Sequence, residues 1–216
     1  MTTKQKTERS NAAPEKRMAR LQELLRTDTP LWEAGIRFAG MDEAGRGPLA
    51  GNVVAACVVM PREPVFPWVD DSKKLSAHRR DKVYDEIMGA ALFVGVGQTS
   101  PEEIDQINIL EATKLAMRRA AEGAPADVFL IDALSGLGLP GEERGIIHGD
   151  ALCYSIAAAS IIAKVTRDRQ MLLLDEQYPG YGFAAHKGYG TAQHISALKA
   201  LGPCPAHRRT FIGHFV

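Results

Sequence analysis

The sequence has no net charge and no long apolar run. No stretch of its 216 residues is apolar enough to span a membrane, and residues 1–30 lack the apolar core of a secretory signal. The 26 basic residues balance 26 acidic ones, so a nucleic-acid binder of this composition must gather its basic residues on one face. We therefore expect a cytoplasmic protein without a membrane partner. The basic start also suits a mitochondrial presequence, but its glutamates oppose that interpretation.

The sequence is also poor in cysteine. Cys57, Cys153 and Cys204 are widely spaced and odd in number, which predicts buried free thiols in a reducing compartment and excludes a disulfide scaffold. The histidines show no metal-ligand spacing, so we interpret none as a zinc ligand. Internal repeats and a long heptad pattern are absent as well. We therefore expect a monomer, with one domain and a small appendage.

The N-terminal segment differs in composition from the rest of the chain. Residues 1–13 are polar and without periodicity, which predicts disorder. From Pro14 onward apolar residues recur near helical spacing, which predicts a short helix packed on the protein's own surface rather than on a partner. We therefore divide the chain into an extension over residues 1–33 and one main domain over residues 34–216.

Beyond the extension, strand and helix patterns alternate in an order typical of an α/β protein. Residues 36–41 and 52–60 flank a glycine-rich loop and predict an antiparallel hairpin. The further strands are expected at 91–98, 127–132 and 144–150, and the helices at 76–90, 107–123 and 151–177. Ser76 is a candidate N-cap for the first of these helices. The order predicts a mixed sheet covered by helices.

Four acidic residues end or follow apolar strands. Asp42 and Glu43 close the first strand, Asp132 ends a strand that is almost entirely apolar, and Asp150 stands between a strand and a helix. If the first and fourth strands are neighbours, their ends bring Asp42 and Asp132 together. Clustered carboxylates repel one another unless a cation joins them, and Mg²⁺ or Mn²⁺ prefers oxygen ligands of this kind.

Each acid also has a simpler interpretation. Asp150, taken alone, is better explained as a helix N-cap. Asp132 could begin a turn, and Asp42 with Glu43 could form a hairpin tip. Adjacent residues on a regular strand point to opposite faces, so both acids serve one site only if the chain bends. Gly45 and Gly47 make such a bend feasible.

Two further features surround the acids. Basic residues cluster in the connecting segments, where they could form an anion-binding rim. They are Arg46, Lys73, Lys74, Lys164, Arg167, Lys187, Arg208 and Arg209. Each alone is better explained as a solvated charge, except Lys164, which follows an apolar stretch. Residues 178–191 contain three tyrosines and four glycines, which suits either stacking on a sugar or base, or a rigid structural loop.

Several motifs in register resemble the signature blocks of bacterial ribonuclease HII (type 2 ribonuclease H). They are GMDEAGRGPLAG, DSKKLS, ASIIAKVTRDR, YPGYGF, HKGYGT and HRRTF, between about residues 36 and 211. The resemblance implies a ribonuclease H-like fold, with a five-stranded mixed sheet flanked by helices and a helical C-terminal portion. It also implies an endonuclease that cleaves the RNA strand of RNA–DNA hybrids. The same enzyme nicks duplex DNA 5′ to an embedded ribonucleotide, which leaves a 3′-hydroxyl and a 5′-phosphate and serves ribonucleotide removal.

The resemblance also assigns roles to residues. The family's catalytic metal ligands, which hold Mg²⁺ or Mn²⁺ for a two-metal mechanism, fall on Asp42, Glu43, Asp132 and Asp150. Its Gly-Arg-Gly motif, which contacts the 2′-hydroxyl through the backbone, falls on Gly45, Arg46 and Gly47. Its tyrosine that stacks on the sugar at the ribo-to-deoxyribo junction falls on Tyr189. We expect Lys73 and Lys164 to contact the substrate as well.

The chain departs from the family pattern at three positions. Ala133 stands where the family usually has glycine, Asn52 where it has proline, and His148 where it has lysine. None of these changes removes a ligand. Two other functions are compatible with parts of the pattern: a nuclease of the same fold that ignores the sugar, and a non-catalytic hybrid-binding module. The four acids oppose the second, because a pure binder gains nothing from negative charge beside phosphates.

Overall fold

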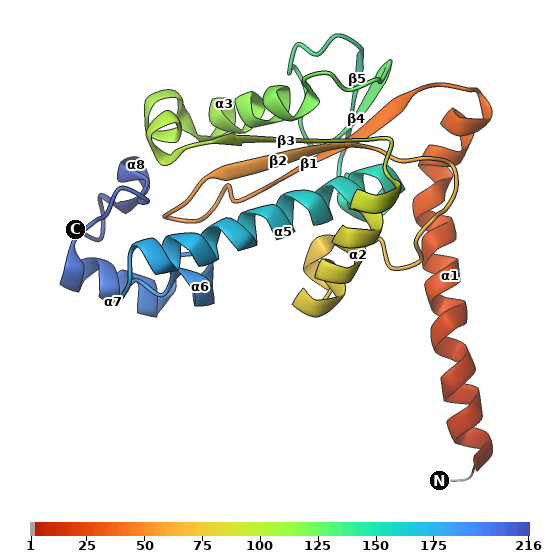
Figure 1. Cartoon of the computed structure of the whole chain (residues 1–216), viewed down its shortest axis with the longest axis horizontal. Coiled ribbons are helices and arrows are strands. Elements are labelled where there is room, and N and C mark those ends of the chain that lie inside the picture. Colours follow the sequence, from red (N-terminus) through yellow and green to blue (C-terminus); the bar gives the residue numbers. More distant parts are fainter. Residues whose placement is uncertain (1–2) are drawn as a thin grey trace.

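A computed structural model describes residues 3–216, with side chains from residue 14 onward, and centres on a five-stranded sheet. The strands lie in the order β3-β2-β1-β4-β5 (Figure 1). Their bounds are β1 Phe38–Ala44, β2 Val53–Val59, β3 Phe93–Thr99, β4 Val128–Asp132 and β5 Glu142–Ile146. β1 and β2 are antiparallel, as are β2 and β3, whereas β4 runs parallel to both β1 and β5. The predicted α/β class, mixed sheet and antiparallel hairpin are confirmed.

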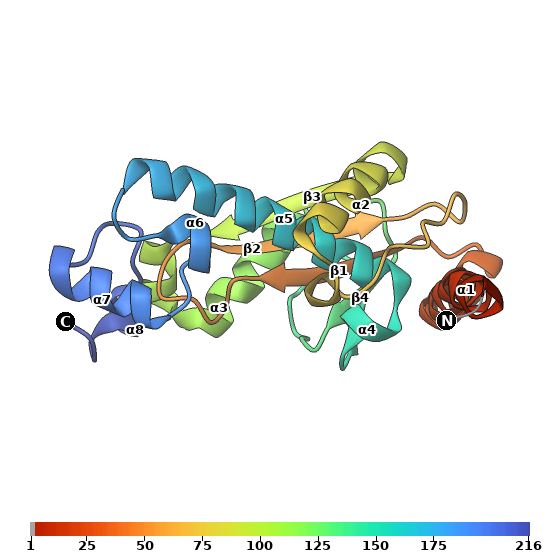
Figure 2. The same cartoon turned by 90° about the horizontal axis from the view of Figure 1, so that it is seen from below.

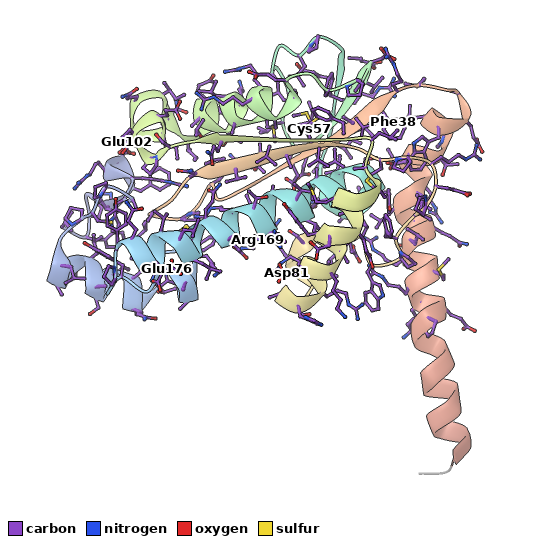
Figure 3. The ribbon with its side chains drawn as sticks, viewed as in Figure 1. Phe38, Cys57, Asp81, Glu102, Arg169 and Glu176 are labelled. Atoms are coloured by element: carbon purple, nitrogen blue, oxygen red, sulfur yellow. The ribbon has the colours of Figure 1, made fainter. Side chains whose placement is uncertain are left out.

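Helices cover both faces of this sheet (Figure 1). Helix α3 (Pro101–Ala121) covers one face, and α5 (Tyr154–Gln177) with α2 (Ala77–Ala90) covers the other. β2 is buried along its whole length because its side chains alternate between the two helix layers: Cys57 packs with α3 residues, whereas Ala56 and Val58 pack with α5 residues. On the second face, Asp81 of α2 and Arg169 of α5 lie 3.5 Å apart (Figure 3).

Three C-terminal helices lie together at one end of the sheet (Figure 2). They are α6 (Phe183–His186), α7 (Ala192–Leu201) and α8 (Arg209–Ile212). The helical C-terminal portion expected from the resemblance is therefore present. Among residues 3–216, no helix combines the length and the hydropathy needed to cross a membrane.

Helix α1 corrects the prediction of disorder at the start of the chain. It spans Thr3–Glu33, so the prediction is wrong from Thr3 onward, while residues 1 and 2 lie outside the described residues. Residues 3–13 contain no glycine and several good helix formers, and the helix continues through Pro14 into the amphipathic part. Leu21 and Leu24 are buried in the same core cluster as residues of α5, which confirms that the helix packs on the protein itself. The boundary at residues 33 and 34 stays a prediction.

The helix predicted over residues 151–177 is interrupted. Gly149–Leu152 form the single turn α4, Cys153 is extended (φ −133°, ψ 128°), and α5 begins at Tyr154. Gly40 of β1 explains why α5 starts close to the sheet: an added Cβ would lie 2.1 Å from the carbonyl carbon of Ser155. The absence of a side chain at Gly40 therefore lets the beginning of α5 contact the backbone of the central strand.

Most element boundaries shift by one to three residues from the predictions, and two shift by more. α3 begins at Pro101 rather than 107, because Ser100 and Glu103 form a reciprocal capping box and Asn108 (φ 66°) only kinks the helix. β5 ends at Ile146 rather than 150, because His148 is left-handed (φ 58°) and α4 begins at the next residue. Both differences arise from local capping and turn chemistry at the ends of elements.

Candidate active site

The sheet register brings Asp42 and Asp132 side by side. Met41 of β1 pairs with Ile131 of the parallel strand β4, so the next residues along both strands are the two aspartates. Met41 and Ile131 pack against the α3 layer, and alternation therefore turns Asp42 and Asp132 toward the α5 layer. The expectation that the first and fourth strands are neighbours is confirmed, and one face of the sheet carries both carboxylates.

Asp150 joins these two aspartates from α4. One carboxylate oxygen from each of Asp42, Asp132 and Asp150 lies within 4.8 Å of the others. The backbone N–H of Gly149 donates to Oδ1 of Asp132 at 2.7 Å, which ties the start of α4 to the end of β4. Asp150 is not the N-cap that it resembled in isolation, because His148 occupies that position and Asp150 lies in the first turn. Its carboxylate faces the other acids instead.

Glu43 stays outside this three-carboxylate cluster. β1 pairs with β2 as far as Ala44, and the cluster of three aspartates does not include Glu43. Glu43 nevertheless lines the same cavity as Asp42. Its Oε1 lies 3.5 Å from Arg46, while its Oε2 is buried without a hydrogen-bond partner. A buried carboxylate oxygen that lacks a donor is suited to bind a cation.

The electrostatics of the cluster favour a divalent cation. Burial raises the pKa of Asp42 well above its usual range, and the neighbouring Glu43 and Asp132 raise it further. Burial is also the main cause that raises the pKa values of Asp132 and Glu43. Nζ of Lys73 lies 3.2 Å from Oδ2 of Asp150. Partial burial lowers the pKa of Lys73, but the hydrogen bond to Asp150 and the charges of the nearby acids outweigh it, so the pKa is raised. An all-oxygen donor set with excess negative charge fits Mg²⁺ or Mn²⁺.

The raised pKa of Asp42 predicts how metal-free stability depends on pH. The folded protein retains a proton on Asp42 above about pH 3.9, where the unfolded chain releases it. The contribution of Asp42 to the free energy of unfolding is therefore present at low pH and is lost as the pH rises toward the raised pKa of the folded protein. Asp42→Asn, which cannot ionise, should be more stable than the unsubstituted chain by a margin that grows from pH 4 to pH 8 in EDTA. Urea denaturation measures this margin, and a margin independent of pH would refute the assignment.

A cavity of about 300 Å³ opens beside the acids. The substrate-contacting residues expected from the sequence all line it: Gly45, Arg46, Gly47, Lys73, Lys164 and Tyr189. Nζ of Lys164 also pairs with Asp168 at 2.7 Å. Tyr189 is 45% exposed, and a Cβ added to Gly47 would lie 3.8 Å from its ring. Bare backbone and an aromatic face therefore border the same cavity as Asp42 and Glu43.

The glycine-rich loop is held from inside by Arg208. This arginine is fully buried, and its guanidinium makes five hydrogen bonds of 2.6–3.0 Å to four carbonyl oxygens, those of Gly45, Arg46, Pro48 and Gly51. Burial lowers the pKa of Arg208 to about 9, which still leaves it charged at neutral pH. The expectation of a solvated charge on an anion-binding rim is wrong for this residue. No local sequence signal distinguishes it from Arg209.

Arg167 performs a related role in α5. It is also buried, and it donates to the carbonyl oxygens of Ala50, Asn52 and Lys187 at 3.0 Å. It therefore links the glycine-rich loop to the segment that carries Tyr189. A Cβ at Gly45 (φ +96°) would lie 2.1 Å from Nε of Arg167, so this approach requires glycine. The sequence indicated a basic segment here, but not that this side chain points inward.

Residues 178–191 combine the two interpretations that the sequence left open. Tyr181 is buried and its ring stacks on Phe183 at 5.3 Å, whereas Tyr189 faces the cavity. His194 binds the carbonyl oxygen of Tyr189 at 2.9 Å through Nδ1, and its Nε2 lies 3.1 Å from that of the buried His207. Burial lowers the pKa of His207 to about 4 and also lowers the pKa of His194, so both rings are mainly neutral at physiological pH. In the described part of the chain, the candidate metal cluster contains only aspartates.

Comparison with known proteins agrees with this geometry. The family model described as Ribonuclease HII matches residues 39–214. The ribonuclease HII of Geobacter sulfurreducens is 57% identical over 178 residues, which cover 82% of each chain. A crystal structure of ribonuclease H2 from Pyrococcus horikoshii matches with a TM-score of 0.67 at 28% identity, covering 81% of this chain and 93% of that one.

A second solved structure, of the PCNA:RNase HII complex from Archaeoglobus fulgidus, also has a TM-score of 0.67, at 27% identity over 82% of this chain and 96% of that one. The family match covers most of the chain and includes all four acids, the glycine-rich loop and Tyr189. The chain therefore belongs to the ribonuclease HII family and is a metal-dependent nuclease.

Proposed function

We propose that this enzyme hydrolyses the RNA strand of RNA–DNA hybrids and nicks duplex DNA 5′ to an embedded ribonucleotide. The products are a 3′-hydroxyl and a 5′-phosphate. One observation carries the proposal: the cavity that contains Asp42 and Glu43 is bordered by Gly45, Gly47 and Tyr189. Residues suited to bind a metal and residues suited to read a sugar therefore share a single space. We propose further that the enzyme acts as a monomer in the cytoplasm.

The glycine-rich loop is suited to recognise ribose. A 2′-hydroxyl both donates and accepts hydrogen bonds, and it distinguishes RNA from DNA at a given position. Gly45 and Gly47 present backbone without side chains, so a ribose can approach the peptide groups closely. Arg208 occupies four carbonyl oxygens of the Gly45–Gly51 turn from the inside. The turn is therefore preorganised before substrate binds.

The four acids are proposed to hold Mg²⁺ or Mn²⁺. When bound, two such ions supply activation of water and stabilisation of the leaving oxygen in a phosphodiester hydrolysis. The proposed ligands are the carboxylates of Asp42, Asp132 and Asp150. Glu43 is proposed as the fourth ligand, through its Oε2, which has no hydrogen-bond partner. Lys73 holds the carboxylate of Asp150, and it lines the cavity with Lys164, where both can contact the phosphates of the substrate strand.

Tyr189 is proposed to stack on the sugar next to the ribonucleotide, on its 3′ side. A flat ring favours deoxyribose there, because a 2′-hydroxyl would crowd it. Tyr189→Ala should slow cleavage at a single embedded ribonucleotide by about tenfold or more, the equivalent of a stacking contact of 1–3 kcal/mol. Tyr189→Phe retains the ring and should remain close to the unsubstituted rate. Single-turnover cleavage measures this, and an unchanged rate in the alanine variant would refute the role at the junction.

The experiment that tests the function uses an end-labelled DNA duplex with one ribonucleotide and an all-DNA duplex of the same sequence. Each is incubated with the enzyme in Mg²⁺, Mn²⁺ or EDTA. We expect a nick immediately 5′ to the ribonucleotide in either metal, no cleavage in EDTA and an intact all-DNA duplex. Equal cutting of both duplexes would show a nuclease that ignores the sugar, and binding without cutting would show a hybrid-binding module.

A further inference from the structure

We infer that helix α1, which precedes the residues matched by the family, is a positioning element for Asp150. The central contact is made by Asp28, which is fully buried. Its carboxylate accepts hydrogen bonds from the backbone N–H groups of Tyr154 and Ser155, each at 3.0 Å. It also accepts from the hydroxyl of Ser155 and from the thiol of Cys153, the latter at 3.2 Å. These donors all lie at the start of α5, three to five residues after Asp150.

Asp28 thus supplies a cap that α5 lacks locally. The first N–H groups of a helix have no partner within the helix, and a side chain at the N-cap usually satisfies one of them. Cys153 occupies the N-cap of α5 and makes no such bond, so a residue more than a hundred positions away provides it. A carboxylate at this end also interacts favourably with the helix dipole. The start of α5 is therefore fixed relative to α1.

Two other residues of α1 bind α4 directly. Nη2 of Arg20 donates to the carbonyl oxygen of Ala151 at 2.8 Å, and the hydroxyl of Thr27 donates to that of Leu152 at 3.2 Å. These carbonyl groups belong to the two residues that come after Asp150. Together with Asp28, the side chains from α1 contact all five residues from Ala151 to Ser155. The backbone that follows Asp150 is therefore held in place by side chains of α1.

Helix α1 also binds the segment that carries Lys73. Arg17 and Arg20 form ion pairs with the buried Asp70 at 3.0 and 2.8 Å. Oδ1 of Asp70 accepts from the backbone N–H of Asp71, at the start of the short 3₁₀ turn Ser72–Lys74. Both partners of the Lys73–Asp150 pair thus stand on segments that α1 contacts. Arg20 contacts both segments at once, since it binds Asp70 and Ala151.

This arrangement has a consequence for metal binding, which rests on the proposed function. A metal ligand must be held within a fraction of an ångström, and outer contacts that orient it typically change metal affinity by 10- to 100-fold. Asp28 touches no ligand and no substrate residue, so its effect reaches the metal only through the placement of α4. Its loss should weaken metal binding while hybrid binding through the glycine-rich loop is retained.

The test compares Asp28→Asn with the unsubstituted enzyme. Asparagine has the same shape but presents an amide NH₂ group where one carboxylate oxygen accepted a hydrogen bond. Titration calorimetry with Mn²⁺, without nucleic acid, should show a dissociation constant raised about tenfold. The Mn²⁺ concentration for half-maximal cleavage should rise equally, with KM for the hybrid at saturating Mn²⁺ changed less than twofold. The matched control, Asp127→Asn, removes an exposed carboxylate paired with Arg37 and should change none of these values.

The outcomes separate this inference from the function itself. Unchanged Mn²⁺ affinity in a folded Asp28→Asn would overturn the inference while the function stands. An unsubstituted enzyme that binds no Mn²⁺ and cuts no ribonucleotide would overturn the function. If Asp28→Asn does not fold, Arg20→Lys is used as the test variant instead. Lysine keeps a cation beside Asp70 but lacks the guanidinium Nη2 that donates to the carbonyl oxygen of Ala151. That variant should raise the dissociation constant about threefold, and no rise would overturn the inference.

Discussion

Asp132→Asn should reduce hybrid cleavage on the order of a thousandfold while leaving the fold intact. The substitution removes one charge from the three-carboxylate cluster, and metal ions in such sites contribute several kcal/mol of transition-state stabilisation. The asparagine Oδ1 can still accept the hydrogen bond from the N–H of Gly149, so the link between β4 and α4 survives. Single-turnover cleavage in saturating Mg²⁺ and Mn²⁺ measures the loss.

Binding of the hybrid should not weaken in the same variant. Removing a carboxylate beside the phosphates lowers repulsion, so the dissociation constant measured in EDTA should stay equal or fall. Asp127→Asn again serves as the control, since Asp127 is exposed and pairs with Arg37 just before β4. Full activity in Asp132→Asn would remove this residue from the metal site, and a matching loss of hybrid affinity would point to a misfolded loop.

Arg208→Met should lower both stability and activity more than other changes outside the acids. Methionine replaces the aliphatic stem of the side chain but removes every donor, so carbonyl oxygens of the Gly45–Gly51 turn lose their partners. Unsatisfied buried polar groups cost about 1–3 kcal/mol each, and partial relaxation of the turn should leave a total of about 3–5 kcal/mol. Urea denaturation measures this loss of unfolding free energy.

The same variant should cleave an embedded ribonucleotide roughly a hundredfold more slowly, because the turn that faces the ribose is no longer preorganised. The cleavage rate of Arg208→Lys should lie between those of the unsubstituted enzyme and Arg208→Met. Lysine keeps the charge but offers fewer donors in a different geometry. Arg209→Met is the matched control, because this neighbouring side chain is exposed. Unfolding free energy and cleavage rate in Arg208→Met close to those of Arg209→Met would show that the five hydrogen bonds do not hold the loop.

Local patterns in the sequence were sufficient for much of the fold, and they singled out four acids as candidates for a metal site. Short apolar runs predicted the five strands, and Ser76 predicted a helix start that the structure confirms. Acids at the ends of apolar runs stood out because they contradict the usual exposure of charge. These features depend on residues a few positions apart, so they can be found without knowing which segments pack together.

Packing between distant segments decided the remaining features. Glu43 lies outside the cluster of three aspartates although it lines the same cavity as Asp42, and Asp28 caps a helix more than a hundred residues away. Arg208 and Arg209 are adjacent and alike in sequence, yet one is buried under the glycine-rich loop and the other is exposed. Each outcome depends on which carbonyl, N–H or carboxylate another element brings within hydrogen-bond distance. A linear pattern of residue types does not contain that information, because only the folded chain sets the distances between its elements.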